Sequence, residues 1–224
     1  MIRFAIKKVR RILADFKAKM RKTYFRFTGS YRQKKLKNTD FTIISNNCWG
    51  GSIYESYGLI KQSPTVGMYF MADEYLRFVS NLQYYLCQCD IEFISPEEAR
   101  YLDFYSGNLP VKYPIARLGD VEIAMMHFHS EEEARAKWER RCKRINWDRL
   151  LVKMNDQNGC TAEQAKAFGA LPYANKVFFT VKDLDAGDCT VRIPAKKDAK
   201  SITFSQEPWG ASKYCNINEL INQL

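Results

Sequence analysis

The chain has 224 residues, of which 46% are apolar and 27% are charged. This composition excludes a disordered or fibrous protein, and the length suits one domain with a sizeable core. The net charge of +10 is unevenly distributed: residues 1–37 hold fourteen Lys and Arg residues against one acid, Asp15, whereas the remainder is mildly acidic. A basic N-terminal segment followed by a mildly acidic remainder predicts an anionic partner, and only the basic segment is expected to contact it.

The first 29 residues are expected to form a basic amphipathic helix. Apolar residues recur at spacings of three and four, so they share one side of a helix: Ile2, Ile6, Val9, Leu13, Phe16 and Met20. Lys8, Arg11 and Lys22 fall on the cationic side. This pattern is typical of helices that lie in a membrane interface, so an anionic membrane surface is the expected partner. The alternative is that the stripe packs on the domain or on a partner chain.

Nucleic acid is not an expected partner, because the basic residues do not continue over the body. The seven cysteines are odd in number and lack a framework spacing, which favours reduced thiols. No apolar run is long enough to span a bilayer, and Lys and Arg interrupt each stretch where a signal peptide needs apolar residues. The expected location is the cytoplasm, with peripheral attachment to the inner face of the cell membrane.

After a polar linker at 30–40, residues 41–224 are expected to form a single α/β domain. Strands are predicted at 41–45, 65–70, 91–94, 111–118, 121–128, 150–154 and 177–181, and helices at 74–88, from 96, at 131–144, from 162 and at 217–223. Ser130 and Thr161 have the spacing of helix N-caps, and Gly119-Asp120 has the composition of a hairpin turn. The alternation predicts a three-layer α/β/α domain with a mixed, mainly parallel sheet.

Three loops at predicted strand ends contain the candidate catalytic residues, where α/β sheets bind ligands. Cys48 lies in a glycine-containing loop, His127 ends a strand, and Asp156 follows another. A thiol, an imidazole and a carboxylate are the groups of a cysteine nucleophile with its base and orienting residue. The loop residues around the cysteine are the expected substrate contacts and oxyanion donors: Asn46, Asn47, Trp49, Gly50 and Gly51. The competing interpretation is that Cys48 is a small residue packed in the fold and that the histidines have hydrogen-bond partners and no catalytic role.

Two further patterns are typical of ligand contacts. Arg141 and Arg144 follow a helix rich in charge and suit the recognition of phosphate or sugar acids, although a solvated Glu/Arg surface is the blander alternative. Asp183 and Asp185 follow a predicted strand, in the spacing by which many glycosyltransferases hold Mg²⁺ or Mn²⁺ with a nucleotide sugar. A simple polar turn explains the same residues.

Several blocks together resemble a family of bacterial proteins labelled "exopolysaccharide biosynthesis", built on domain of unknown function 1919. The blocks are ISNNCWGG at 44–51, SPTVG at 63–67, YPI at 113–115, LGD at 118–120, MH at 126–127, SEEEA at 130–134, WERR at 138–141, RINW at 144–147, Asp156, GCT at 159–161, LP at 171–172 and NKV at 175–177. The resemblance covers about residues 41–182. His127 falls on the family's His-aromatic position, whereas His129 departs from it, so His127 is the better candidate.

The resemblance implies a role in assembling cell-surface polysaccharide and leaves the reaction open. The leading hypothesis is a membrane-associated transferase that acts on a sugar or lipid-linked sugar, with acyl-type transfer through Cys48, His127 and Asp156. A glycosyltransferase that uses Asp183, Asp185, a metal and a nucleotide sugar is the second hypothesis. The third is a non-catalytic, membrane-tethered scaffold.

Overall fold

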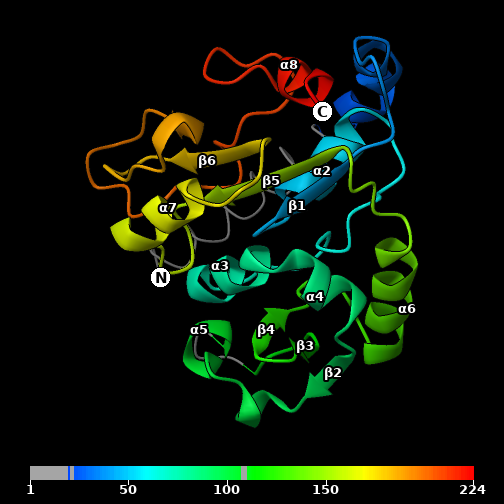
Figure 1. The fold of residues 1–224 in the computed structure, drawn as a ribbon, viewed down its shortest axis with the longest axis vertical. Helices are drawn as coiled ribbons and strands as arrows, with labels where there is room; N and C mark the ends of the chain where they lie inside the picture. Colours follow the sequence, from blue (N-terminus) through cyan, green and yellow to red (C-terminus); the bar gives the residue numbers. More distant parts are fainter. Residues whose placement is uncertain (1–19, 21–22, 107–109) are drawn as a thin grey trace, which may run out of the picture.

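A parallel sheet of four strands forms the centre of the computed structural model, which describes residues 20, 23–106 and 110–224. Its strands are β1 (Thr42–Ser45), β5 (Leu150–Asn155), β6 (Lys176–Thr180) and β7 (Thr190–Arg192), in that order across the sheet. All three pairings are parallel. The predicted α/β class is confirmed (Figure 1).

The antiparallel strands form a second sheet instead of an edge of the first. It contains β2 (Ile91–Ile94), β3 (Ile115–Leu118) and β4 (Val121–Ala124), each paired with the next. The predicted hairpin at Gly119-Asp120 joins β3 to β4, and Gly119 has a φ of +56°, which a residue without a side chain adopts readily. The expectation of one mixed sheet is thus corrected to two sheets.

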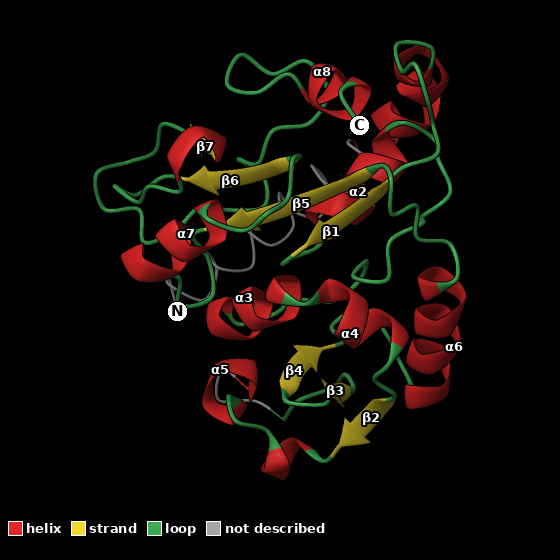
Figure 2. Ribbon diagram, in the orientation of Figure 1, coloured by secondary structure: helices red, strands yellow, loops and turns green. Residues whose placement is uncertain are grey.

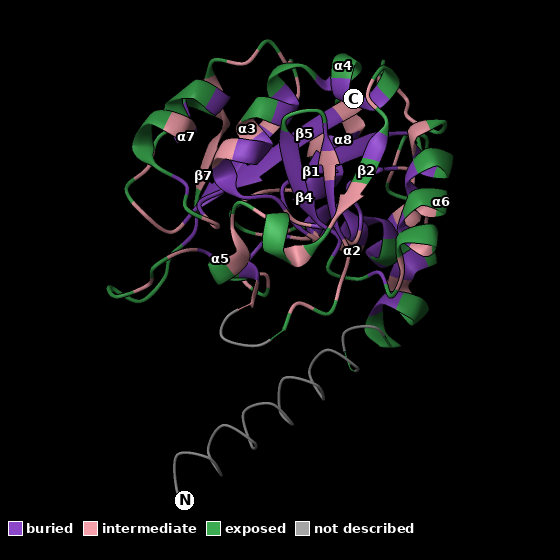
Figure 3. Ribbon diagram, turned by 90° about the horizontal axis from the view of Figure 1, so that it is seen from below, coloured by how far each residue is buried: buried purple, intermediate pink, exposed green. Residues whose placement is uncertain are grey.

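Helices cover both faces of the parallel sheet and separate it from the second sheet (Figures 1 and 2). They are α2 (Trp49–Ser56), α3 (Ala72–Ser80), α4 (Leu82–Cys87), α5 (Leu102–Ser106), α6 (Glu131–Cys142), α7 (Ala162–Gly169) and α8 (Ile217–Asn222), with short 3₁₀ turns at Pro96–Glu98 and Gly187–Cys189. In Figure 2, α3 and α4 lie between the two sheets. Ribbon segments at the centre of Figure 3 are almost entirely buried, as the interior of a layered domain requires.

Neighbouring residues of β1 point into different cores, because side chains alternate along a strand. Ile43 packs in a core with Tyr54 of α2 and Ile217 of α8. Ile44 packs in a larger core with Phe78 of α3 and Ile123 of β4. The parallel sheet is therefore apolar on both faces, which explains its short β-branched runs.

The cap signals at Ser130 and Thr161 were confirmed, whereas the cap expected at Asp73 lies inside α3, whose N-cap is Met71. Ser130 and Thr161 accept hydrogen bonds from the backbone N–H groups three residues on, as predicted. The helix expected at 74–88 is broken at Asn81, whose φ of −147° and ψ of 59° separate α3 from α4. Residues 65–70 form no strand and contribute only an isolated bridge between Tyr69 and Ala124.

Most of the predicted membrane stripe lies outside the described residues: Ile2, Ile6, Lys8, Val9, Arg11, Leu13, Phe16 and Lys22. Met20 is described and is exposed. A helix over residues 23–33 includes the first residues of the segment predicted as a linker. Among the residues placed in the structure, no helix has the length and apolar character needed to cross a bilayer.

The helix at 23–33 is fixed to the body through one face. Phe25 is buried and meets the ring of Trp209 edge-on, with 4.8 Å between centroids. Arg32 is also buried, and its Nε donates to the Ser56 carbonyl over 2.6 Å. Gly29 permits the close approach, because a Cβ there would lie 3.2 Å from the backbone nitrogen of Gly58. This part of the basic segment is a packed element of the domain.

Candidate functional site

The main cavity opens at the carboxyl ends of β1 and β5, where ligands bind in parallel α/β sheets. Its volume is about 860 Å³, within the range of sites for small molecules. Asn47 and Cys48 follow β1, and Gln157 and Asn158 follow β5; all four line the cavity. The parallel pairing of β1 with β5 brings these loops together although they are over 100 residues apart in the chain.

The structure gathers five of the ten residues that the sequence predicts as catalytic or substrate-binding. Asn47, Cys48, Gly51, His127 and Arg141 all line this cavity. The others do not: Asn46, Trp49, Gly50, Arg144 and Asp156. The hypothesis of a shared site is therefore retained for the first group only.

Three cationic side chains of the described residues line the cavity, from Lys61, Lys137 and Arg141, and Arg141 is the most buried of them. Helix α6 presents it from its last turn, where it is buried, and its Nη1 donates to the Val66 carbonyl over 2.7 Å. Burial lowers the pKa of the guanidinium, and the charges of Arg140 and Arg144 lower it further. In the described part of the chain no carboxylate forms an ion pair with Arg141. A buried guanidinium without a carboxylate is suited to bind an anionic group of a ligand.

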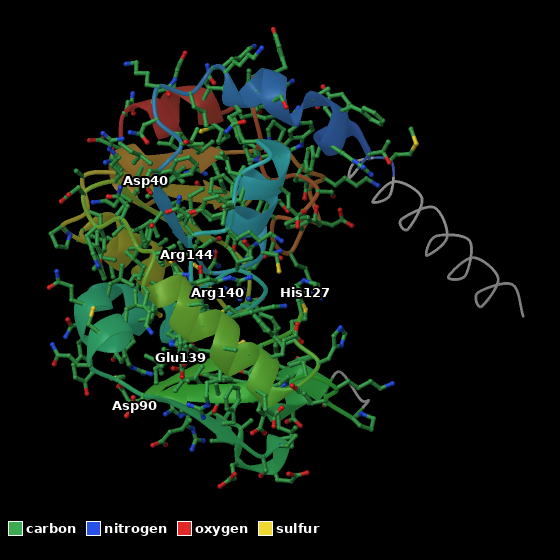
Figure 4. The ribbon with its side chains drawn as sticks, turned by 90° about the vertical axis from the view of Figure 1, so that its right-hand side faces the viewer. Asp40, Asp90, His127, Glu139, Arg140 and Arg144 are labelled. Carbon is green, nitrogen blue, oxygen red and sulfur yellow. The ribbon has the colours of Figure 1, made fainter. Side chains whose placement is uncertain are left out.

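Arg144 is exposed in the turn after α6, and Figure 4 shows it near the end of that helix, away from His127. Lys137, one turn before Arg141, lines the cavity instead and pairs with Glu133. Lys137 and Arg141 are four residues apart and share one face of α6, whereas the helix ends at Cys142, before Arg144. Lys137 and Arg141 both approach the ring of Phe128, at 5.5 and 6.0 Å from its centroid.

One wall of the cavity is aromatic. Tyr69, Phe104, Tyr105 and Tyr113 line it, and the ring of Tyr69 lies 5.8 Å from that of Tyr105 and 6.4 Å from that of Tyr113. The hydroxyls of Tyr69 and Tyr113 are 2.9 Å apart and hydrogen-bonded. Tyrosine rings combine an apolar face with a polar tip, which suits a ligand that has both C–H faces and hydroxyls.

Cys48 and His127 line the same cavity, but the thiol is held in its neutral form. Cys48 is the residue before α2, and His127 lies in an exposed turn after β4. Burial raises the pKa of Cys48 to about 11, and the negative charge of Glu207 acts in the same direction. Reactive cysteines have lowered pKa values, because the thiolate is the nucleophile. The environment of Cys48 thus differs from that of an activated nucleophile.

Asp156 has a different surrounding from the one expected of an orienting residue. Its Oδ2 accepts hydrogen bonds from Thr180 Oγ1 and from the backbone N–H groups of Val181 and Lys182, and its Oδ1 accepts one from Ile202. The carboxylate is buried and joins the end of β5 to the end of β6 and to residue 202. Its oxygens are occupied by structural donors, so we assign it to the support of the fold.

Gly50 and Trp49 also have structural positions. A Cβ on Gly50 would lie 3.2 Å from Ile43 Cγ2, so the glycine lets α2 pack closely on β1. Trp49 is buried against Phe179, and its Nε1 donates to the Pro208 carbonyl over 2.7 Å. Gly51 lines the cavity, and a Cβ there would meet Val66 Cγ1 at 2.9 Å.

A buried polar cluster lies behind the cavity wall. Lys153 of β5 is fully buried, and its ammonium contacts Asn46 Oδ1, Asn47 Oδ1 and the carboxylate of Glu207. Asn155 Nδ2 donates to the same carboxylate over 2.8 Å. Burial lowers the pKa of Lys153, while the charge of Glu207 opposes that shift. The predicted substrate contact Asn46 belongs to this cluster, since its Nδ2 donates to Asn155 Oδ1 over 2.8 Å.

Asp183 and Asp185 line a separate cavity between α7 and the 3₁₀ turn at Gly187–Cys189. Asp183 is 97% exposed and pairs with Arg192 over 2.8 Å. Asp185 Oδ1 accepts hydrogen bonds from the Gly187 N–H and the Thr190 hydroxyl. In the part of the chain that is described, no three His, Cys, Asp or Glu residues are placed to hold a metal ion. These carboxylates have the contacts of a polar turn and fit a divalent metal poorly.

One signal in the sequence points to the buried cluster, and none points to the aromatic wall. Lys153 interrupts the apolar run of β5, and a charge inside a buried strand requires a partner. That partner, Glu207, is 54 residues away. The aromatic residues come from segments that lie apart in the chain, so no local spacing marks them as a group.

The fold and the cavity define the chain as an α/β protein with a ligand cavity at the carboxyl ends of its parallel strands. It belongs to the family described as "Domain of unknown function (DUF1919)", whose model matches residues 19–224. The chain is also similar to a protein of Haemophilus influenzae (strain ATCC 51907 / DSM 11121 / KW20 / Rd) that carries the description "Uncharacterized protein". The two are 33% identical over 190 residues, which cover 84% of this chain and 85% of the relative.

Proposed function

We propose that this protein is a membrane-associated transferase that acts on an anionic, lipid-linked saccharide during assembly of a surface polysaccharide. The observation that carries the proposal is Arg141, a buried guanidinium that lines the cavity and forms no ion pair with any described carboxylate. A phosphate or a sugar carboxylate has the charge and geometry that a guanidinium binds. The pathway is the one implied by the resemblance of the sequence to exopolysaccharide proteins.

The two sides of the cavity divide the recognition of such a ligand. Arg141 and Lys137 supply positive charge beside Phe128. The Tyr69 and Tyr113 side supplies ring faces and hydroxyls for the sugar. A cavity with convergent polar groups favours an enzyme over a scaffold.

His127 is the candidate general base. It lines the cavity in an exposed turn, so an acceptor hydroxyl of the substrate has access to it. Transfer to a sugar requires that this hydroxyl lose its proton to the base as the new bond forms, and imidazole is the side chain best matched to neutral pH. His127→Asn is expected to lower kcat by roughly 100-fold or more, with little change in the Kd of the substrate.

Acyl transfer through Cys48 is the second candidate. The shared cavity of Cys48 and His127 favours it, and the raised pKa of the thiol opposes it. Cys48→Ser separates the two: a thioester mechanism loses essentially all turnover, whereas a mechanism based on His127 retains it. Glycosyl transfer with a metal at Asp183 and Asp185 is disfavoured by the hydrogen bonds and ion pair that occupy those carboxylates.

The binding experiment compares Arg141→Ala with Arg140→Ala on the same helix. Calorimetric titration with sugar 1-phosphates, uronic acids and nucleotide sugars should give a measurable Kd for at least one anionic sugar. Loss of a charged hydrogen bond weakens binding by roughly 10- to 100-fold, so Arg141→Ala should raise the Kd by this factor. Arg140 is exposed and should change the Kd less than twofold. Equal effects of the two substitutions would contradict the assignment of the cavity.

The membrane part of the proposal rests on exposed side chains of the helix at 23–33 and on the exposed Met20 before it. Met20, Tyr24, Phe27 and Tyr31 recur at spacings of four, three and four and are all exposed, Phe27 to 80%. Lys and Arg residues are interspersed with them. An exposed aromatic and basic helix face suits an anionic lipid surface.

The helix should therefore be tested by substitution as well as by truncation. Phe27→Ala with Tyr31→Ala should weaken sedimentation with phosphatidylserine vesicles and leave binding to neutral phosphatidylcholine vesicles low. Removal of residues 1–19 leaves Phe25 and Gly29 on the body and should weaken sedimentation further. Unchanged sedimentation of both variants would refute membrane association through this segment.

A further inference from the structure

The environment of Glu207 has the composition of a ligand site. Its carboxylate accepts hydrogen bonds from the Lys153 ammonium, from Asn155 Nδ2 over 2.8 Å, and from Asn47 Nδ2 over 3.1 and 3.3 Å. All four side chains are buried. Asn47 lies in the loop after β1, and Lys153 and Asn155 belong to β5, whereas Glu207 comes from a distant segment.

The donors lie where parallel sheets bind ligands. Asn47 follows β1. Asn155 is the last residue of β5, and Lys153 lies two residues before it in the same strand. The carboxyl ends of adjacent parallel strands form the usual crevice for ligands. Asn47 also lines the main cavity, so the cluster and the cavity share a wall.

Glu207 reaches the donors from a strap that lies across this end of the sheet. Residues 194–210 are all described and contain neither helix nor strand. Hydrogen bonds hold the strap at Ile202 and at Pro208: the Ile202 N–H donates to Asp156, and the Pro208 carbonyl accepts from Trp49. Phe204, between these ties, lines the main cavity.

Stability alone explains the ion pair poorly. Desolvation of two charges offsets most of their attraction, and apolar residues of similar volume often stabilise a core as well. The Lys153 ammonium lies 5.8 Å from the ring centroid of Trp49 and 5.8 Å from that of Phe179, so an apolar side chain would find apolar neighbours there. An ammonium held in this position is suited to bind an anion.

We propose that Asn47, Lys153 and Asn155 form a carboxylate-binding site that Glu207 occupies in cis, under a strap that forms part of the cavity wall. The site takes carboxylate ligands, and opening the strap joins it to the main cavity. It supplies a position for negative charge in addition to Arg141, and it does not depend on the reaction proposed above.

Chemical rescue tests this site. Glu207→Ala leaves Lys153 buried without its counter-ion, so the variant should unfold at a lower temperature than the wild type. Sodium formate at 100 mM, compared with 100 mM sodium chloride, should raise the melting temperature of Glu207→Ala by about 3 °C or more. The wild type, in which Glu207 fills the site, should melt at the same temperature in both salts.

Glu207→Gln is the matched control, because its side chain fills the site without the negative charge and should leave no room for formate. Equal melting temperatures of Glu207→Ala in formate and chloride would overturn the proposal, as would an equal response of Glu207→Gln. If Glu207→Ala is unfolded in chloride, recovery of its folded circular dichroism spectrum in formate supports the site. Lack of recovery in both formate and acetate overturns it.

Discussion

The thiol of Cys48 gives the sharpest test of the proposed chemistry. Its pKa of about 11 leaves roughly one molecule in 3,000 ionised at pH 7.5, against about one in ten for an ordinary cysteine of pKa about 8.5. The stronger intrinsic nucleophilicity of a more basic thiolate recovers roughly tenfold of this deficit. Alkylation of Cys48 by iodoacetamide should therefore be about 20- to 30-fold slower than that of an ordinary thiol.

The assay is peptide mass spectrometry after timed alkylation between pH 7 and 10. Cys87, an exposed thiol of the same chain, serves as the internal reference. The rate at Cys48 should still be rising with pH at pH 10. Glu207→Gln should increase the rate, because the Glu207 charge is one cause of the raised pKa. A rate at Cys48 that reaches a plateau below pH 8 would refute this reasoning and restore the thiol as the nucleophile.

Three further predictions concern stability. Phe25→Ala should lower the free energy of unfolding by about 3 kcal/mol, because it empties the contact with Trp209, whereas Phe27→Ala on the exposed face should change it by less than about 0.5 kcal/mol in urea titrations. Asp156→Asn should lower the free energy of unfolding by about 2–4 kcal/mol in the same titrations, because the asparagine NH2 group, a donor, would face backbone N–H or hydroxyl donors that the carboxylate now accepts from. A loss below about 0.5 kcal/mol would contradict the structural role. Burial raises the pKa of Cys160 to about 11, so the folded state keeps the thiol proton at pH values where the unfolded state has lost it. The free energy of unfolding should therefore fall between about pH 8.5 and 11. Cys160→Ala should make this fall less steep in melting curves recorded at several pH values.

Part of the fold could be predicted from the sequence because it depends on interactions between residues close together in the chain. The caps at Ser130 and Thr161 and the hairpin at Gly119 depend on residues within three positions, and all were confirmed. The division into two sheets was not readable, since the antiparallel strands are short and their position is set by packing against α3. Asn81 likewise breaks a helix whose apolar spacing continues through it.

The candidate site was readable to the extent that it lies in loops after strands. Cys48 and His127 were expected at one edge of the sheet and line one cavity. Asp156 was nominated by the same rule, but its role depends on donors at 180–182 and 202, which sequence spacing does not reveal. Lys153 was overlooked because its partner comes from the strap, far along the chain.

Helix α8 completes the core on one face of β1, and its position far along the chain from that strand affects how the protein is made. Ile217 and Ile221 of α8 cover the face of the sheet to which Ile43 belongs, and Asn222 hydrogen-bonds to the backbone of Lys35 and Lys37. During synthesis that face remains uncovered until α8 has left the ribosome. Nascent chains should therefore depend on chaperones until that point, and a chain that stops before residue 217 should yield a product that quality-control proteases remove.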